Sequence, residues 1–151
     1  MNDAVYRYDG TTWTKMIGGS AGASDFGCPN GVAAHGGNAY FITFCSNQVL
    51  RIDGPNQTTE VASVEAGPGG VGRLDGLVIR SDGTMFFSDW RLPGSGKGKV
   101  YRADLDRPGP GGAVIAARLA APADITFDAD NGRVLIPSAF DLVLKIVQVK
   151  G

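Results

Sequence analysis

The amino-acid sequence predicts an all-β protein with β-propeller architecture, built from about three four-stranded blades. The main observation is an internal repeat. Three segments begin with a short polar residue, continue into an apolar strand and reach a second apolar strand after a turn; the polar residues are Asn30, Asp75 and Asp124. These residues are 45 and 49 positions apart. Self-similarity at such a period, in repeats made only of strands, is typical of propellers.

Composition agrees with this fold class. The chain has 151 residues with 23 glycines and 8 prolines, which suits many short strands joined by turns. No stretch has sustained helical periodicity. The formal net charge is -1 and the basic residues are spread along the chain, so we expect no nucleic-acid partner. No apolar run approaches the roughly 20 residues of a membrane-spanning helix, so we expect no membrane partner either.

The strands can be assigned blade by blade within a single propeller segment, residues 1–151. Residues 1–17 hold the two outer strands of a partial blade. Four-stranded blades follow at residues 28–64 and 73–117, and a three-stranded blade occupies residues 122–149. The third strand of each blade alternates between apolar residues and basic, small or acidic residues, as a strand with two different faces requires.

The order of the strands predicts about half of a ring. Propellers typically have four to eight blades. The assigned strands begin in the middle of one blade and end after the third strand of another. This arrangement favours the C-terminal half of a six-bladed propeller that has been truncated. A homodimer in which two copies complete six blades is the alternative.

The two cysteines fall in one predicted hairpin. A turn at residues 36–38 would pair Ala34 with Tyr40, and Cys28 would then lie almost opposite Cys45. A disulfide is geometrically plausible at such positions. It would imply an oxidising compartment, and we expect a periplasmic or extracellular parent protein. Two small buried thiols are the alternative.

The polar residues that reveal the repeat are also the candidate site. The first strand of a propeller blade lines the central channel, so Asn30, Asp75 and Asp124 should converge at one end of it. Carboxylate and amide oxygens suit Ca²⁺, which takes 6–8 oxygen ligands. The alternative is a structural role, because Asp or Asn at a strand start often only caps a turn. We favour that alternative for Asp124.

Two further residues are candidate substrate contacts. Trp90 and Arg91 follow the second strand of the central blade and should lie at the same end as Asp75. Arg91 could face an anionic group of a ligand, and Asp124 is a third candidate contact. Packing between blades is the alternative for Trp90.

Several segments resemble one known family. Residues 74–88, with the sequence Leu-Asp-Gly-Leu-Val-Ile-Arg-Ser-Asp-Gly-Thr-Met-Phe-Phe-Ser, resemble the blade signature of the gluconolactonase and senescence-marker-protein family. Residues 29–32 one blade earlier, and residues 122–137 in the last blade, are similar to it as well. The resemblance runs from about Cys28 to the end of the chain. NHL-repeat and strictosidine-synthase-like propellers share much of this pattern.

The resemblance implies a six-bladed propeller with one divalent cation in its channel. Asn30 and Asp75 match two of the family's metal ligands in residue type, order and spacing. Asp75 also matches the family's general acid/base, which acts on a lactone or ester. The family's remaining ligands, a Glu and another Asn, belong to earlier blades. This chain lacks those blades, so we expect weak metal binding and little activity from it alone.

The sequence therefore predicts a segment of a metal-dependent lactonase or esterase that acts on a small molecule. A non-catalytic NHL-type propeller that binds a ligand or protein is the first alternative. A strictosidine-synthase-like propeller, in which the channel metal is structural, is the second.

Overall fold

A computed structural model describes residues 3–18, 26–65, 73–91 and 97–149. Fourteen strands and no helix are found among these residues, which confirms the all-β prediction. The strands form four sheets. No described helix could cross a membrane.

The sheets follow one another along the chain. The first contains β1 (Ala4–Tyr8) and β2 (Trp13–Gly18). The second contains β3 (Pro29–His35), β4 (Asn38–Thr43), β5 (Gln48–Gly54), β6 (Gln57–Ser63) and the short β10 (Gly109–Pro110). The third contains β7 (Leu74–Ile79), β8 (Thr84–Asp89), β9 (Gly98–Asp104) and β11 (Ala113–Leu119). The fourth contains β12 (Thr126–Asp128), β13 (Arg133–Ser138) and β14 (Val143–Gln148).

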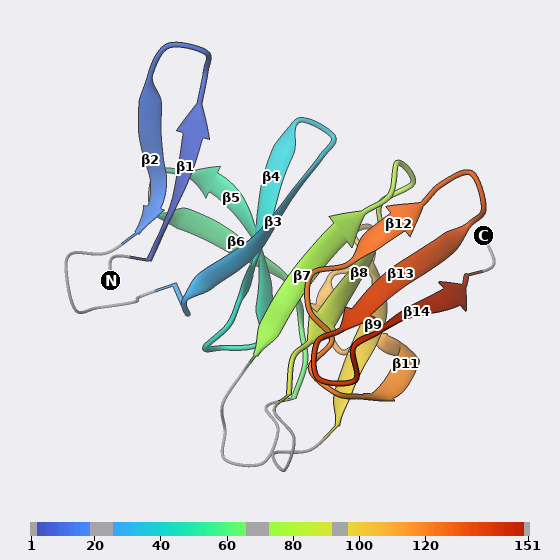
Figure 1. The fold of residues 1–151 in the computed structure, drawn as a ribbon. Coiled ribbons are helices and arrows are strands. Elements are labelled where there is room, and N and C mark those ends of the chain that lie inside the picture. Colours follow the sequence, from blue (N-terminus) through green and yellow to red (C-terminus); the bar gives the residue numbers. More distant parts are fainter. Residues whose placement is uncertain (1–2, 19–25, 66–72, 92–96, 150–151) are drawn as a thin grey trace.

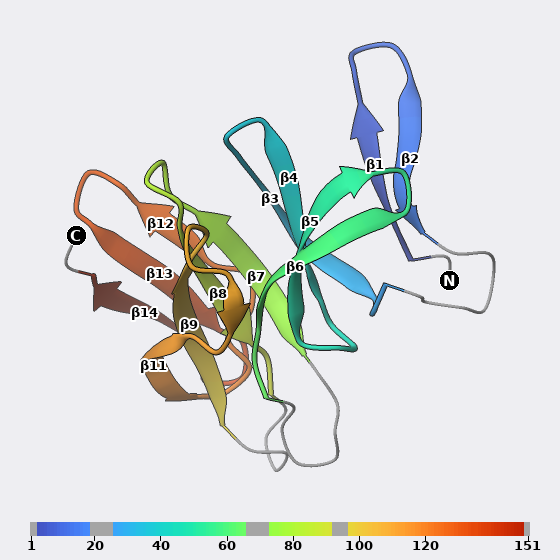
Figure 2. The same ribbon diagram turned by 180° about the vertical axis from the view of Figure 1, so that it is seen from behind.

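The four sheets stand side by side like an open fan (Figures 1 and 2). The innermost strands of the second to fourth sheets are neighbours, since β3 contacts β7 and β7 contacts β12. Within the second to fourth sheets, consecutive strands pair antiparallel, except that β10 joins β6 in parallel. This is the arrangement of successive propeller blades, which the repeat predicted.

The core consists of three apolar layers, one in each wedge between neighbouring sheets. Successive side chains of a strand point to opposite faces of its sheet, so one strand contributes residues to two of these layers. Phe87 faces the second sheet, whereas Phe86, one residue earlier, faces the fourth. Phe41 and Ile42 divide in the same way between the first and third sheets. All four side chains are fully buried, and burial of such side chains contributes about 1.5–3 kcal/mol each.

The hairpin formed by β3 and β4 differs from the predicted register by one residue. Ala33 pairs with Tyr40, and His35 pairs with Asn38, so the loop has two residues instead of three. Gly36 and Gly37 both have positive φ, at 56° and 80°. Two-residue hairpin loops favour this conformation because it matches the strand twist. The sequence prediction included Asn38 in the turn and was wrong there.

The loop between β9 and β11 reaches a neighbouring sheet. Gly109–Pro110 pairs with Ala62 and Ser63 at the outer edge of the second sheet. The amide of Gly111 donates a further hydrogen bond to the carbonyl of Ser63, at 2.7 Å. One blade therefore attaches to the rim of its neighbour.

Two glycines let the innermost strands approach closely. A Cβ on Gly31 would lie 2.5 Å from the carbonyl oxygen of Asp75. A Cβ on Gly76 would lie 2.6 Å from the backbone nitrogen of Ile125. Real side chains do not tolerate such contacts, so the glycine after Asn30 and after Asp75 is needed to bring these polar residues together.

Candidate functional site

The structure brings together the polar residues that begin the repeats. Asn30 lies in β3 and Asp75 in β7, and Asn30 Nδ2 donates a hydrogen bond to Asp75 Oδ1 at 2.8 Å. Asp124 precedes β12, and its charge acts on Asp75. Three oxygen-bearing side chains from three adjacent sheets thus gather at one place.

The carboxyl of Asp75 has a perturbed pKa. Partial burial raises the pKa of its carboxyl above the ordinary value of 3.8. The hydrogen bond from Asn30 opposes that rise, and the negative charge of Asp124 adds to it. A carboxyl whose pKa moves toward neutral pH is better suited to exchange protons, which is the property expected of a general acid or base.

Ser88, at the end of β8, positions two of these residues, although it was not among those predicted from the sequence. Its Oγ accepts a hydrogen bond from the Gly76 amide at 2.8 Å and donates one to the Ala123 carbonyl at 2.9 Å. Ser88 is fully buried. It therefore links the residue after Asp75 to the residue before Asp124. The signal for this role in the sequence is a single hydroxyl residue directly after the apolar residues 85–87.

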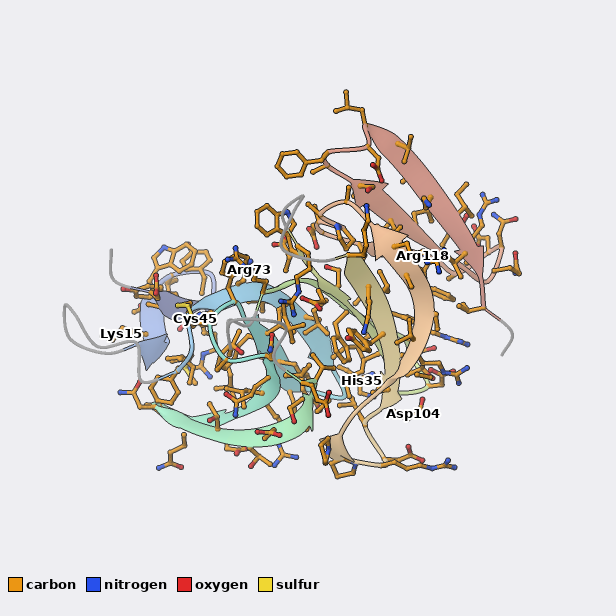
Figure 3. The ribbon with its side chains drawn as sticks, turned by 90° about the horizontal axis from the view of Figure 1, so that it is seen from below. Lys15, His35, Cys45, Arg73, Asp104 and Arg118 are labelled. Carbon is orange, nitrogen blue, oxygen red and sulfur yellow. A yellow bond between two sulfur atoms is a disulfide. The ribbon has the colours of Figure 1, made fainter. Side chains whose placement is uncertain are left out.

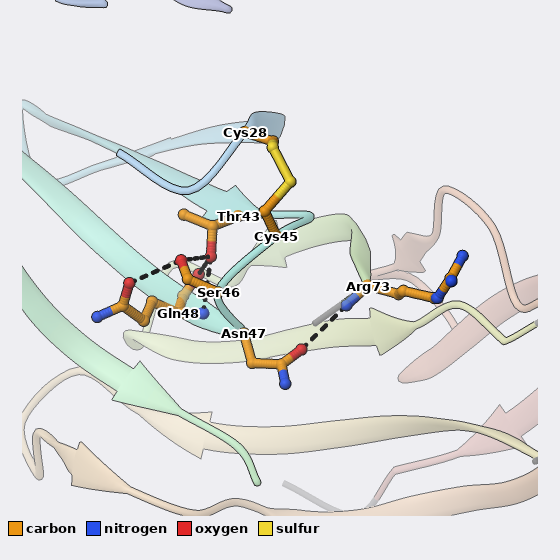
Figure 4. Close-up of a disulfide and its surroundings, with 7 residues drawn as sticks. All are labelled: Cys28, Thr43, Cys45, Ser46, Asn47, Gln48 and Arg73. Carbon is orange, nitrogen blue, oxygen red and sulfur yellow. Dashed lines mark hydrogen bonds between the residues drawn. A yellow bond between two sulfur atoms is a disulfide. The ribbon is translucent and has the colours of Figure 1, made fainter. Parts of the chain in front are cut away.

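The cysteines lie beside Asn30. Cys28 and Cys45 form a disulfide with a Cα–Cα distance of 5.3 Å (Figure 4). Backbone hydrogen bonds of 2.8 Å from Phe44 to Cys28 and from Cys45 to Gly27 continue the pairing. The disulfide thus ties the residue directly before β3, two residues before Asn30, to the turn that follows β4. The described residues contain no free cysteine.

Arg91 occupies a different environment from the one we predicted. Its Nε lies 2.8 Å from Asp89 Oδ1, and its Nη2 donates to Asp89 Oδ2 at 3.0 Å. The two side chains are only 6% and 4% exposed. Burial raises the pKa of Asp89, and Arg91 opposes that rise, with smaller contributions from Lys99 and Arg73. The guanidinium of Arg91 is therefore paired with the buried carboxylate of Asp89 and does not face solvent.

Trp90 belongs to an aromatic group drawn from three sheets. Its ring centroid lies 5.9 Å from that of Phe44, after β4, and 6.3 Å from that of Phe140, after β13. Arg73 lies directly before β7 (Figure 3). Its guanidinium carbon is 5.8 Å from the Phe44 centroid and 5.7 Å from the Trp90 centroid. Arg73 was not among the residues predicted from the sequence, because its neighbours in space are distant along the chain.

Comparison with solved structures identifies the architecture. The chain superposes on a chain of a nidogen/laminin complex with a TM-score of 0.69 and 20% identity, covering 90% of this chain and 49% of that one. The fold is that of a β-propeller. A gluconolactonase candidate gives 0.68 at 14% identity, covering 93% of this chain and 49% of the other. The gluconolactonase XC5397 from Xanthomonas campestris gives 0.65 at 18% identity, covering 83% and 46%.

These similarities confirm the resemblance to gluconolactonase-like propellers at the level of the fold. The chain spans about half the length of each of the three structures. No protein-family model matches the sequence. No curated protein matches it either.

The residues at the inner edge of the propeller blades suit a hard cation. Asp75 and Asp124 offer carboxylate oxygens, and Asn30 carries an amide oxygen that is separate from the Nδ2 atom donating to Asp75. Within the described ranges, no three His, Cys, Asp or Glu side chains form a metal-binding group. These three side chains could hold a cation only together with further ligands, because Ca²⁺ takes 6–8 oxygen ligands.

Proposed function

We propose that this propeller segment contributes to a metal-dependent hydrolase of the lactone or ester type. The observation that carries the proposal is the contact between Asn30 and Asp75, together with the raised pKa of Asp75. The similarity in fold to two gluconolactonase structures supports it. Asn30 and Asp75 would hold a divalent cation, most simply Ca²⁺, and Asp124 would adjust the charge of the site.

The proposed chemistry gives each residue a separate task. A bound divalent cation would polarise the carbonyl of a lactone or lower the pKa of a water molecule. Asp75 would accept or return the proton at its carboxylate. Asn30 would orient that carboxylate through its amide. Ser88 would hold the backbone around Asp75 and Asp124 in place.

The metal site can be tested by titrating Mn²⁺ and following the broadening of backbone amide resonances. We expect selective broadening at Asn30, Asp75 and Asp124 at roughly millimolar metal, because three side chains supply fewer ligands than Ca²⁺ prefers. Excess Ca²⁺ should reverse the broadening, and Asp75→Asn should abolish it. The matched control Asp106→Asn removes an exposed carboxylate from a loop and should have no effect. Uniform broadening, or no broadening, would reject the site.

The same samples test the hydrolytic role. Any metal-stimulated hydrolysis of a panel of lactones should be low for this chain and should fall to the uncatalysed rate in Asp75→Asn. Stimulation that survives the substitution would rule out Asp75 as the acid or base.

A second candidate function is protein binding without catalysis. The match to a propeller in the nidogen/laminin complex favours it, because that structure is of one protein bound to another. In such a protein, Asp75→Asn would leave partner binding unchanged. Under either function, the Cys28–Cys45 disulfide supports a periplasmic or extracellular location.

A further inference from the structure

Arg73 is held rigidly at the end of the blades that carries Asp75. Its amide donates to Asn47 Oδ1 at 3.0 Å, and its carbonyl accepts from the Trp90 amide at 2.8 Å. Asn47 itself is only 2% exposed. The backbone of Arg73 is therefore fixed by the second and third sheets together, two residues before Asp75 in the same segment.

The side chain of Arg73 is a cation without an ion-pair partner in the described parts of the chain. Five other arginines form ion pairs with aspartates, but Arg73 forms none. The nearby carboxylate of Asp89 is already held by Arg91. The rings of Phe44 and Trp90 lie near the guanidinium of Arg73. Guanidinium groups stack their faces on aromatic rings and bind planar carboxylates along their edges with two parallel hydrogen bonds.

We propose that Arg73, Phe44, Trp90 and Phe140 form a binding subsite for a small aromatic carboxylate. The edge of the Arg73 guanidinium binds the carboxylate, and the three rings contact the flat apolar body of the ligand. Phe140 is 53% exposed, and Phe44 and Trp90 are both partly exposed, so a ligand can reach them. Aromatic rings in offset or edge-to-face contact attract one another beyond the effect of burial alone.

The subsite adds a substrate feature to the proposed function. Arg73 and Asp75 belong to one segment, and two residues of extended strand span about 7 Å of backbone. If the chain contributes to a hydrolase, which is the part of this inference that rests on the proposed function, its substrate carries an aromatic acid group. Binding of the carboxylate itself requires neither a metal nor Asp75. The role that the sequence suggested for Arg91 therefore falls to Arg73.

The test uses NMR of the two tryptophan indole N–H resonances in the whole chain. Trp13 stacks on Tyr8 in the first sheet, with centroids 4.7 Å apart, and serves as an internal control. Titration with benzoate should shift the Trp90 resonance saturably and leave the Trp13 resonance unchanged. Benzamide has the same ring without the charge and should bind roughly tenfold or more weakly. Acetate has the charge without the ring and should bind more weakly as well.

Substitutions separate the subsite from the metal site. Arg73→Gln should weaken benzoate binding roughly tenfold or more and leave benzamide binding unchanged. Arg102→Gln removes an equal charge from β9, where Arg102 pairs with Asp104, and should leave benzoate binding intact. Asp75→Asn should also leave it intact, so loss of the metal site does not imply loss of the subsite.

Three results would overturn the inference. These are equal binding of benzoate and benzamide, equal effects of the two arginine substitutions, and parallel shifts of both indoles. If Arg73→Gln does not fold, the comparison of benzoate with benzamide on the unmodified chain still decides the question.

Discussion

At the scale of single residues, folding makes the charged form of Asp75 less favourable. Its raised pKa means that the native state holds this proton more tightly than the unfolded state does. Stability is therefore lost as the pH rises from the ordinary pKa of 3.8 through the raised one, and the loss is complete above it. Such a cost to stability is common at functional sites, so it agrees with the proposed role of Asp75.

Asp75→Asn should accordingly stabilise the protein at neutral pH. The amide oxygen of the new side chain can still accept the Asn30 hydrogen bond, and the charge is gone. We expect the free energy of unfolding at pH 7 to rise by less than about 1 kcal/mol, since Asp75 is partly exposed to solvent. The gain should disappear below pH 3.8, where the carboxyl is protonated in both states. Thermal unfolding across this pH range provides the measurement, and lower stability at pH 7 would contradict the expectation.

Gly76 should tolerate no side chain. A Cβ there would lie 2.7 Å from Asp124 Cα and 2.6 Å from the Ile125 nitrogen, and both are backbone atoms. Gly76→Ala should therefore lower the free energy of unfolding by about 2–3 kcal/mol through overpacking. Gly54→Ala is the control, because a Cβ on Gly54 would come no closer than 3.4 Å to its neighbours. Equal urea midpoints for the two variants would show that the inner strands can separate at little cost.

At the scale of elements, the Cys28–Cys45 disulfide restrains the first strand of the second sheet. It closes a loop with a sequence separation of 17 residues. Loop-closure entropy predicts that reduction lowers the free energy of unfolding by about 3 kcal/mol. Urea unfolding with and without reductant measures this difference. The double variant Cys28→Ala/Cys45→Ala should match the reduced protein and show no response to reductant. If reductant changed the stability of that variant, the stability difference could not be assigned to this disulfide.

The strands could be predicted from the sequence because each has its own signal. Apolar alternation and glycine turns mark the hairpins, and the period of the repeat places Asn30, Asp75 and Asp124 together. The predicted register of the β3–β4 hairpin was wrong by one residue, because a Gly-Gly-Asn stretch allows loops of two or three residues. The pairing of β10 with β6 depends on a contact between blades, which leaves no periodic pattern.

The candidate site also has a part that the sequence predicts and a part that it does not predict. The repeat predicts that Asn30 and Asp75 lie near one another, but it does not predict the hydrogen bond between them. Arg73 is different, because its surroundings are rings that follow β4, β8 and β13 in three different sheets. The sequence shows Arg91 beside Trp90 but not the buried Asp89 carboxylate that binds it. A role that depends on residues from several blades can be recognised only from the three-dimensional structure.

At the scale of the whole molecule, the fan of sheets has an apolar end at β14. Leu142, Val143, Leu144 and Ile146 are 45–90% exposed. Among the described residues β14 pairs only with β13, so it is also an edge strand with unpaired backbone groups. Exposed apolar edge strands favour pairing with another chain. A second copy of the chain is the simplest partner, and a homodimer that completes six blades is one form that the pairing could take.

We therefore expect self-association at micromolar to millimolar concentrations, measured as a rise in average mass by sedimentation velocity. Leu144→Lys should weaken it, because a lysine on an edge strand resists pairing and Leu144 is 56% exposed, so its loss costs the fold little. Gln57→Lys adds the same charge at the exposed start of β6 and is the matched control. A discrete dimer that Leu144→Lys dissociates would favour closure of a ring over open-ended association, since a closed pair leaves no further edge to extend. A monomeric mass at every concentration would show that this edge does not drive association, and the homodimer hypothesis would then fail.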